Sequence, residues 1–358
     1  MTVKKLCRST FLSIFNIGGG KIGFAFNVLI CNLINHISRL KESHENEQKT
    51  NFPKPRFLAE NHSKTSTREI KMSMNIIRKI THEEVMMLHM LGILPRHIFG
   101  LAGHPLLDQA LKPGKLYKTL RLLLPQYGFT PGYPEMLLAR AQRILSAQRN
   151  AGVGTISCFD VDYPKSLMEI CDFPPLIHYL GDSSLFSELN QVAVVGARNA
   201  DRQGSEAAWK LGYEFGKDHI VVSGLAAGCD TAAHRGCLEA GGRTVAVVAT
   251  GLDTVFPQEN EDLQKDILRS GGAVLSEQLF GAEAKPKYLV ARNRLQAALA
   301  NTVIVAQCPE RSGTLHTVKF AQRYHKDVKA WRFTVRNEAN AGNFALIGSG
   351  VASSIVLE

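Results

Sequence analysis

The sequence predicts an α/β protein, with a doubly wound, mostly parallel Rossmann-like sheet preceded by a small all-helical domain. Two observations predict it. From about residue 150 onward, continuous apolar runs such as 192–196 and 244–251 alternate with helical segments of ten to fifteen residues. Strands that are apolar throughout are typical of a parallel sheet covered on both faces. Between residues 80 and 150, apolar residues recur at helical spacing only.

The helical domain is expected over residues 76–150. Thr81 and Glu84 form a capping-box pattern ahead of the apolar stretch 85–94. Apolar residues at helical spacing continue through three further segments, 106–112, 116–124 and 134–149. No chemistry-bearing pattern accompanies them, so a packing or interaction module is expected.

Residues 1–73 are expected to take no part in the fold. An apolar stretch over 11–34 follows Lys4, Lys5 and Arg8, but Lys21 and three glycines interrupt it, and a charge near a bilayer centre is costly. Residues 41–73 are polar and typical of a disordered linker. An over-extended reading frame that truly starts near Met72 or Met74 is the favoured interpretation, and a membrane anchor is the alternative. We therefore expect a cytoplasmic protein that does not bind membranes.

Charge and cysteine content narrow the class of protein. The formal net charge is +10, but residues 1–75 hold 12 Lys and Arg against 5 Asp and Glu, so most of the excess lies outside the predicted fold. Individual arginines must then carry any nucleic-acid binding. The 7 cysteines are scattered and include no CxxC pair, which argues against a disulfide framework and against a metal site.

The Rossmann-like domain is expected over residues 151–358. Its strands are predicted at 152–158, 174–182, 192–196, 219–224, 244–251, 272–277, 302–307 and 328–333, the last of which is expected to end the series. Its helices are predicted at 205–218, 231–242, from near 260, at 293–300 and at 312–326.

Ligands of doubly wound sheets bind beyond the carboxyl ends of the strands, where the strand order switches. Glycines at these ends allow backbone N–H groups to approach an anion, and helix N-termini favour negative charge. Arg198 follows the strand at 192–196 and is suited to phosphate. For single glycines tight turning is the simpler explanation. His234 could be a core histidine, and Asp230 an N-cap.

The segment Arg292-Asn293-Arg294 is expected to open a helix, where cations oppose the helix dipole. A nearby anion, or a carboxylate such as that of Glu277, would relieve this cost. No GxGxxG follows the first parallel strand, and no GxxxxGK[ST] occurs anywhere in the chain. A dinucleotide-dependent dehydrogenase and a P-loop enzyme are therefore disfavoured.

Taken in order, several motifs resemble the DprA/Smf family of DNA-processing proteins over residues 150 to about 352. They are DVDYPKSLMEICDFPPLIHYLGD, VAVVGARNADRQG, VVSGLAAGCDTAAHRGCLEAGGRTVAVVATGLDTVFPQEN, GAVLSE, RNRLQAALANTVIVAQ, SGTLHTVKFAQ and GNFALIGSGVASSI. The helical residues 80–150 fit the N-terminal helical domain of that family.

The resemblance implies a protein that binds single-stranded DNA and loads a RecA-type recombinase during natural transformation. It also implies a homodimer, no metal or nucleotide cofactor, and no enzymatic activity. Carried over by position, the nucleic-acid-binding residues would be Arg198, Ser223, Gly224, Gly228, Asp230, His234, Arg235, Gly251, Arg292, Asn293, Arg294, Ser312, Gly313 and Thr314.

Four positions depart from related patterns, and the winged-helix tail that some members of the family carry is expected to be absent. Leu289 and Val290 stand where the family has Phe-Pro, so a base-stacking aromatic is missing there, and Gln307 replaces an acidic residue. Thr317 stands where related nucleoside-monophosphate hydrolases have the glutamate of their PGGxGTxxE loop. Such a hydrolase and a nucleotide-binding sensor remain the alternative functions.

Overall fold

The computed structural model describes residues 80–101 and 115–357. The expectations for residues 1–73 and for a helix at 106–112 lie outside the described residues. None of the helices in the described ranges is long and apolar enough to span a membrane.

The described residues before position 151 form helices α4 (His82–Met90), α5 (Pro95–Gly100), α7 (Leu116–Leu123) and α8 (Tyr133–Asn150). The predicted capping box is confirmed, because the Thr81 hydroxyl accepts from the backbone N–H of Glu84 while the Glu84 carboxylate accepts from that of Thr81. Residues 80–99 and the described residues from 115 onward belong to one compact unit. Within it the His82 ring bonds to Asp160 at 2.6 Å, next to β1. The domain boundary at residue 150 stays a prediction.

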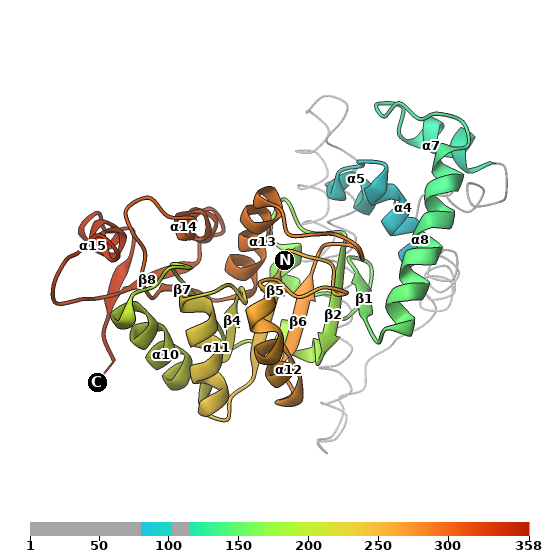
Figure 1. Cartoon of the computed structure of the whole chain (residues 1–358). Helices are drawn as coiled ribbons and strands as arrows, with labels where there is room; N and C mark the ends of the chain where they lie inside the picture. Colours follow the sequence, from blue (N-terminus) through green and yellow to red (C-terminus); the bar gives the residue numbers. More distant parts are fainter. Residues whose placement is uncertain (1–79, 102–114, 358) are drawn as a thin grey trace, which may run out of the picture. The chain divides into compact units, whose positions relative to one another are not determined.

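Residues 151–357 build one mixed, mostly parallel sheet, as the sequence predicts (Figure 1). In the described chain its strands are β1 (Gly154–Ser157), β2 (Leu176–Gly181), β3 (Gln191–Val195), β4 (Ile220–Ser223), β5 (Thr244–Val248), β6 (Ala273–Ser276), β7 (Thr302–Val305), β8 (Asp327–Trp331) and β9 (Ser353–Ile355). Their spatial order is β1-β2-β6-β5-β4-β3-β7-β8-β9, and only the pairs β1–β2 and β2–β6 are antiparallel.

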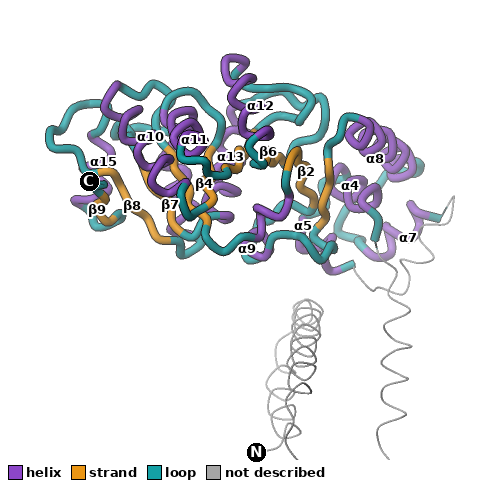
Figure 2. The backbone as a smooth tube through the Cα atoms, turned by 90° about the horizontal axis from the view of Figure 1, so that it is seen from below, coloured by secondary structure: helices purple, strands orange, loops and turns teal. Residues whose placement is uncertain are grey.

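Helices cover both faces of this sheet. They are α9 (Lys165–Met168), α10 (Arg202–Gly216), α11 (Cys229–Glu239), α12 (Glu261–Arg269), α13 (Pro286–Leu299), α14 (Thr314–Arg323) and α15 (Ala341–Gly348), with short 3-10 turns at Ser183–Ser187 and Gln258–Asn260. Helices α10, α11 and α12 lie side by side on one face (Figures 1 and 2). The sheet therefore has two separate cores.

Successive residues of the buried strands point to opposite faces of the sheet and pack in different cores. Val194 of β3 packs with Leu211 of α10, whereas its neighbour Val195 packs in the cluster that contains Leu295 of α13 and Val318 of α14. Every residue of β3 to β6 is buried, which explains why these strands read as continuous apolar runs.

The strand order places a switch point beside β3. The chain runs outward from β3 through β4 and β5 to β6, then returns to β7 on the other side of β3. Crossovers that leave in opposite directions diverge at this point, and the carboxyl ends of β3 and β7 therefore open toward a common crevice.

Two expectations about the elements were wrong. Helix α13 begins at Pro286, six residues before Arg292, so the Arg-Asn-Arg segment does not open a helix. Pro286 occupies the first turn, where a missing backbone N–H costs nothing. The strand around residue 330 does not end the series either, because α15 and the short, partly exposed β9 follow it.

Candidate functional site

A cleft of about 460 Å³ lies at the carboxyl ends of β3 and β7, at the switch point. Four segments of the chain meet there. Its walls are formed by residues 195–199 after β3, Ala226 and Asp230 after β4, Pro286, Leu289, Val290, Arg292, Asn293 and Gln296 of α13, and Pro309, Arg311, Ser312, Gly313, Thr314 and Thr317 around the start of α14.

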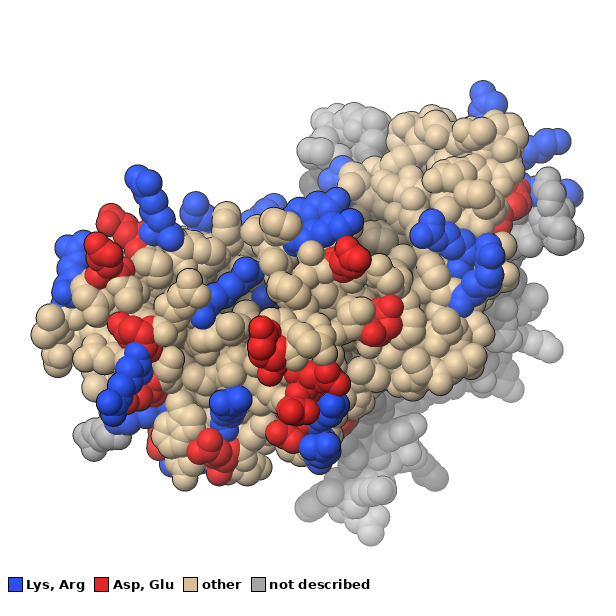
Figure 3. Space-filling model, in the orientation of Figure 1, with Lys and Arg blue, Asp and Glu red and all other residues tan. Residues whose placement is uncertain are grey.

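Arg198 is the exposed cation that follows β3. Within the described part of the chain, its side chain forms no ion pair or hydrogen bond. The backbone beneath it is fixed, because the N–H of Ala197 donates to the carbonyl of Gln307 at 2.8 Å and the N–H of Cys229 donates to the carbonyl of Ala197 at 3.1 Å. In Figure 3, Lys and Arg gather beside α13, whereas the front helices carry both signs of charge. Arg198 is thus a free cation on a rigid loop.

Gln307 and Asp201 join the β7 and β3 sides of the cleft. The Gln307 amide donates to the Asp201 carboxylate at 2.7 Å, and its oxygen accepts from the Asp201 backbone N–H at 3.1 Å. The same carboxylate caps α10 by accepting from the N–H of Gly204 at 2.8 Å. Gln307, which replaces an acidic residue in the resembled pattern, is therefore a structural partner of a neighbouring acid.

The loop between β4 and α11 is held closely against its neighbours. The Ser223 hydroxyl is buried and donates to the carbonyl of Val194 at 2.7 Å. Gly228 has a φ of 77°, and a Cβ at that position would overlap the carbonyl oxygens of Ala197 and Arg198. Glycine is thus required here by both backbone conformation and space. Ser223 and Gly228 shape the cleft without projecting into it.

Arg292 and Asp230 are buried behind this loop, where their opposite charges interact. Arg292 is 4% exposed, and its Nη1 donates to the carbonyl oxygens of Gly224 and Val247. A Cβ at Gly224 would overlap both Nη1 of Arg292 and the Asp230 carboxylate. Burial raises the pKa of Asp230, against the opposing charge of Arg292. Burial also lowers the pKa of Arg292 to about 10, against the opposing charge of Asp230.

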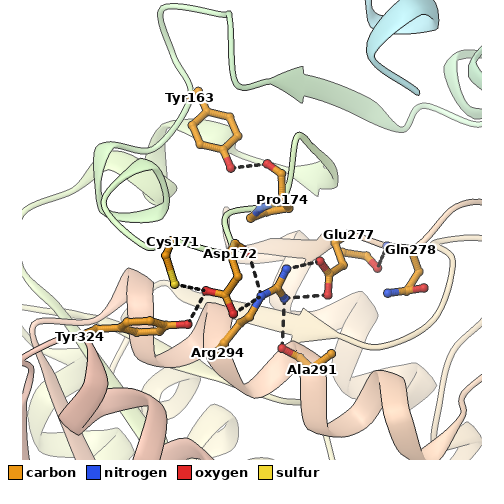
Figure 4. A network of polar contacts seen from close by, with 10 residues as sticks. Tyr163, Cys171, Asp172, Pro174, Glu277, Gln278, Ala291, Arg294 and Tyr324 are labelled. Carbon is orange, nitrogen blue, oxygen red and sulfur yellow. Dashed lines mark hydrogen bonds and ion pairs between the residues drawn. The ribbon is translucent and has the colours of Figure 1, made fainter. Parts of the chain in front are cut away.

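Arg294 does not line the cleft. Its guanidinium makes a bidentate pair with Glu277, at 2.8 and 2.6 Å, and its Nε donates to the carbonyl of Asp172 at 3.1 Å (Figure 4). Glu277 is thus a partner of an arginine of this segment, although the segment lies inside the helix and not at its start, where the cost was expected. Arg294 therefore holds α13 to the segment after α9, and Asn293 is the partly exposed member that lines the cleft beside Arg292.

His234, Arg235 and Gly251 also lie outside the cleft. His234 is fully buried and bonds through Nδ1 to the Thr244 hydroxyl of β5 at 2.8 Å, and burial lowers its pKa to about 3. It is a core histidine, the alternative that the sequence left open. Arg235 is exposed on α11 and borders a groove between α10 and α11. Gly251 is buried behind the loop that contains Leu279 and Ala282.

The turn Ser312-Gly313-Thr314 brings hydroxyl and backbone donors to the opposite wall. The Ser312 hydroxyl lies 3.0 Å from the Thr314 hydroxyl and accepts from the Thr314 backbone N–H at 3.2 Å. Thr314 begins α14, so the positive end of the helix dipole adds positive potential to this wall of the cleft. Thr317 lies one turn further on and is buried in the same wall.

Three polar lining residues, Asn199, Gln296 and Arg311, are not among the residues carried over by resemblance. Arg311 is the most consequential, because it is a second exposed cation that lines the cleft opposite Arg198. Its position directly before Ser-Gly-Thr, after a parallel strand, was the available signal. No sequence motif indicated that Asn199 and Gln296 would line the cleft.

These features fit an anionic ligand. Arg198 and Arg311 are exposed on two sides of the cleft, and a helix N-terminus with two hydroxyls completes it. Asp230 is the one carboxylate in the lining, and it is buried beside Arg292. Among the described residues, no group of three His, Cys, Asp or Glu side chains could hold a metal ion. The fold and the cleft thus define the class as a doubly wound α/β protein with a basic crevice at its switch point.

Comparison with known proteins gives the family. Residues 154–357 match the family described as DNA recombination-mediator protein A, and the chain belongs to this family. This confirms the resemblance to DprA/Smf proteins. The chain is 39% identical over 196 residues to the DNA processing protein DprA of Streptococcus pneumoniae. The aligned residues cover 55% of this chain and 69% of that protein. It is 33% identical over 219 residues to the DprA of Bacillus subtilis, and this alignment covers 60% of this chain and 73% of the relative.

Solved structures agree with this assignment. The structure of DprA from S. pneumoniae superposes with a TM-score of 0.62 at 32% identity, covering 78% of this chain and 95% of that one. A DprA structure from Helicobacter pylori, described as revealing a single-stranded DNA binding mode, superposes with a TM-score of 0.52 at 27% identity. That match covers 57% of this chain and 91% of the other.

Proposed function

We propose that this protein binds single-stranded DNA in the switch-point cleft, with Arg198 as the principal phosphate contact. The observation that carries the proposal is the free guanidinium of Arg198 on a rigid backbone at the carboxyl end of β3. A guanidinium presents a planar fork of donors that matches a phosphate group. Arg311 and the first turn of α14 would hold the same or the adjacent phosphate from the other wall.

The character of the cleft favours a single strand over a duplex. A single strand can bend its backbone into a crevice, and its unpaired bases offer faces to apolar side chains such as that of Leu289. The cations of the cleft are directed at phosphates, and phosphate contacts carry no sequence information. Binding should therefore depend weakly on sequence and strongly on salt.

We further propose that the DNA-bound protein is a homodimer that loads a RecA-type recombinase and has no catalytic activity of its own. Membership of a recombination-mediator family supports this proposal. Its test is whether the protein accelerates assembly of a recombinase on single strands already covered by a single-strand-binding protein. Acceleration that is lost with Arg198→Ala would support both the DNA contact and the loading.

The direct test of DNA binding uses the full chain and fluorescent 40-nucleotide single strands, with a duplex of the same sequence in parallel. We expect the single strand to bind more tightly, and Arg198→Ala to weaken it. Arg269→Ala is the matched control, because Arg269 is an exposed arginine at the end of α12, paired with Asp266. Equal binding of both DNAs, or displacement of the strand by a mononucleotide at low concentration, would contradict the proposal. The second result would favour a nucleotide sensor.

A further inference from the structure

Phe256 is a large aromatic side chain that the fold leaves outside its cores. It follows β5, in the segment that leads to α12, and 46% of its surface is exposed. Its neighbour in the same segment, Val255, packs against the cluster beneath α12, whereas Phe256 belongs to none of the core clusters. Within the described chain, its ring contacts no other aromatic ring. Exposure of a phenylalanine ring gains nothing for folding.

The ring lies beside the proposed DNA contact. Phe256 lines a recess of about 100 Å³ together with Arg198, Leu289 and Arg292. These last three residues also line the larger cleft, so the recess continues it toward the carboxyl end of β5. An apolar ring therefore stands next to the one free guanidinium that follows β3.

This combination suits one nucleotide unit. A base presents an apolar face that stacks on an aromatic ring, and the adjacent phosphate needs a cation within the reach of a sugar. Leu289 and Val290 of α13 are aliphatic, so the α13 wall of the cleft offers no ring at these positions. Phe256 reaches the site from a different segment of the chain.

Resting on the proposed function, we propose that Phe256 is the stacking platform for a base whose phosphate binds Arg198. The contact uses only the face of the base, so it adds affinity for every sequence alike. It also separates two contributions within one site, since Arg198 supplies the salt-dependent attraction and Phe256 supplies a contribution that salt barely changes.

The experiment compares a thymidine oligonucleotide with one of the same length whose bases are absent. Phe256→Leu keeps the apolar bulk but removes the ring, Phe256→Tyr keeps the ring, and Tyr133→Ala is the control, because Tyr133 is similarly exposed at 43% on α8. We expect Phe256→Leu to weaken binding of the thymidine strand by about tenfold, within the range measured for a base–aromatic stack. Its affinity for the abasic strand and its salt slope should match those of the unaltered protein, and Phe256→Tyr should bind normally.

The possible outcomes distinguish base stacking on Phe256 from the proposed DNA binding on which it rests. If Phe256→Leu binds the thymidine strand as tightly as the unaltered protein does, or loses both strands equally, Phe256 is not a stacking platform, although DNA binding through Arg198 stands. If the unaltered protein binds neither strand, both proposals are wrong. Normal binding by Tyr133→Ala is required for the loss to be specific to the cleft.

Discussion

The Nη1 atom of Arg292 donates a hydrogen bond of 2.6 Å to the carbonyl oxygen of Gly224, the first residue after β4. The same atom donates to the carbonyl of Val247 in β5. The arginine thus ties α13 to two neighbouring strands while its charge stabilises the buried carboxylate of Asp230. Arg292 lines the cleft at its buried back wall, and we expect its main contribution to be to stability.

Arg292→Ala is expected to lower the free energy of unfolding by about 3–5 kcal/mol, because it leaves Asp230 buried without its opposing charge. Urea unfolding at pH 7 measures this. Arg235→Ala, which removes an exposed arginine of α11, should change stability by less than about 0.5 kcal/mol. If Arg292→Ala instead kept its stability and flattened the salt dependence of DNA binding, Arg292 would be a DNA ligand.

Arg198→Ala is expected to change the salt dependence of DNA binding and to leave stability unchanged. For single strands, log K falls with log salt by about 0.7 per phosphate neutralised, so removal of one contact should flatten the slope by about that amount. Its melting temperature should stay the same, because the exposed side chain has no partner among the described residues. Fluorescence titrations between 50 and 300 mM salt measure the slope. A lowered melting temperature with an unchanged slope would show that Arg198 is structural.

Gln307→Glu is expected to destabilise the protein, because it would place a second carboxylate where the amide now donates to Asp201 at 2.7 Å. Like charges at this distance repel, and the N-cap of α10 would weaken, at a cost of about 1–2 kcal/mol. The double variant Asp201→Asn with Gln307→Glu restores a donor and should recover most of the loss in thermal unfolding. Equal stability of the single and double variants would contradict this pairing.

No free base is expected when the protein is incubated with nucleoside monophosphates. Thr317 lies in the cleft wall where a hydrolase would need its glutamate, and the lining carboxylate of Asp230 is buried beside Arg292. Chromatography of the reaction mixture measures base release. Release that disappears with Asp230→Asn would overturn this expectation and make the protein an enzyme.

The fold could be predicted because the strands β3 to β6 are buried throughout, and because a helix follows each of the parallel strands β3 to β8 along the chain. What could not be predicted lay where burial is partial. The strand β9 has three residues, and two of them are exposed serines, so its sequence lacks the run of apolar residues that predicts a strand. Proline is common in the first turn of a helix, so Pro286 indicated the true start of α13. The predicted start was placed instead at the charged residues 292–294.

The site was predicted less completely than the fold, because sequence shows which residues are near a strand end but not which way they point. Arg292 and Arg294 are two positions apart on one helix, so they project about 200° apart. One is buried behind the cleft and the other pairs with Glu277. Residue type alone could not separate them from Arg198, which is free. Phe256 carried no signal at all until its exposure was seen.

His234 gives the protein a calculable sensitivity to acid. Burial, together with the charge of Arg292, lowers its pKa from the ordinary 6.5 to about 3, so the folded protein keeps the ring neutral at pH 7. The unfolded chain takes up a proton below pH 6.5, whereas the folded chain does not until far lower pH. The stability that His234 contributes is therefore fully present above pH 6.5 and is lost progressively as the pH falls toward 3.

Between pH 7.5 and pH 5.5, this difference should cost about 1.4 kcal/mol of unfolding free energy for His234 alone. His178, whose pKa burial also lowers to about 3, should add a similar loss. His234→Gln keeps a hydrogen-bonding group near Thr244 but cannot titrate, so it should remove about 1.4 kcal/mol of this pH dependence. Urea unfolding of the unaltered protein and of His234→Gln at both pH values measures the difference. An unchanged pH dependence in His234→Gln would mean that the ring takes up its proton over the same pH range in the folded and unfolded chains, and would contradict this expectation.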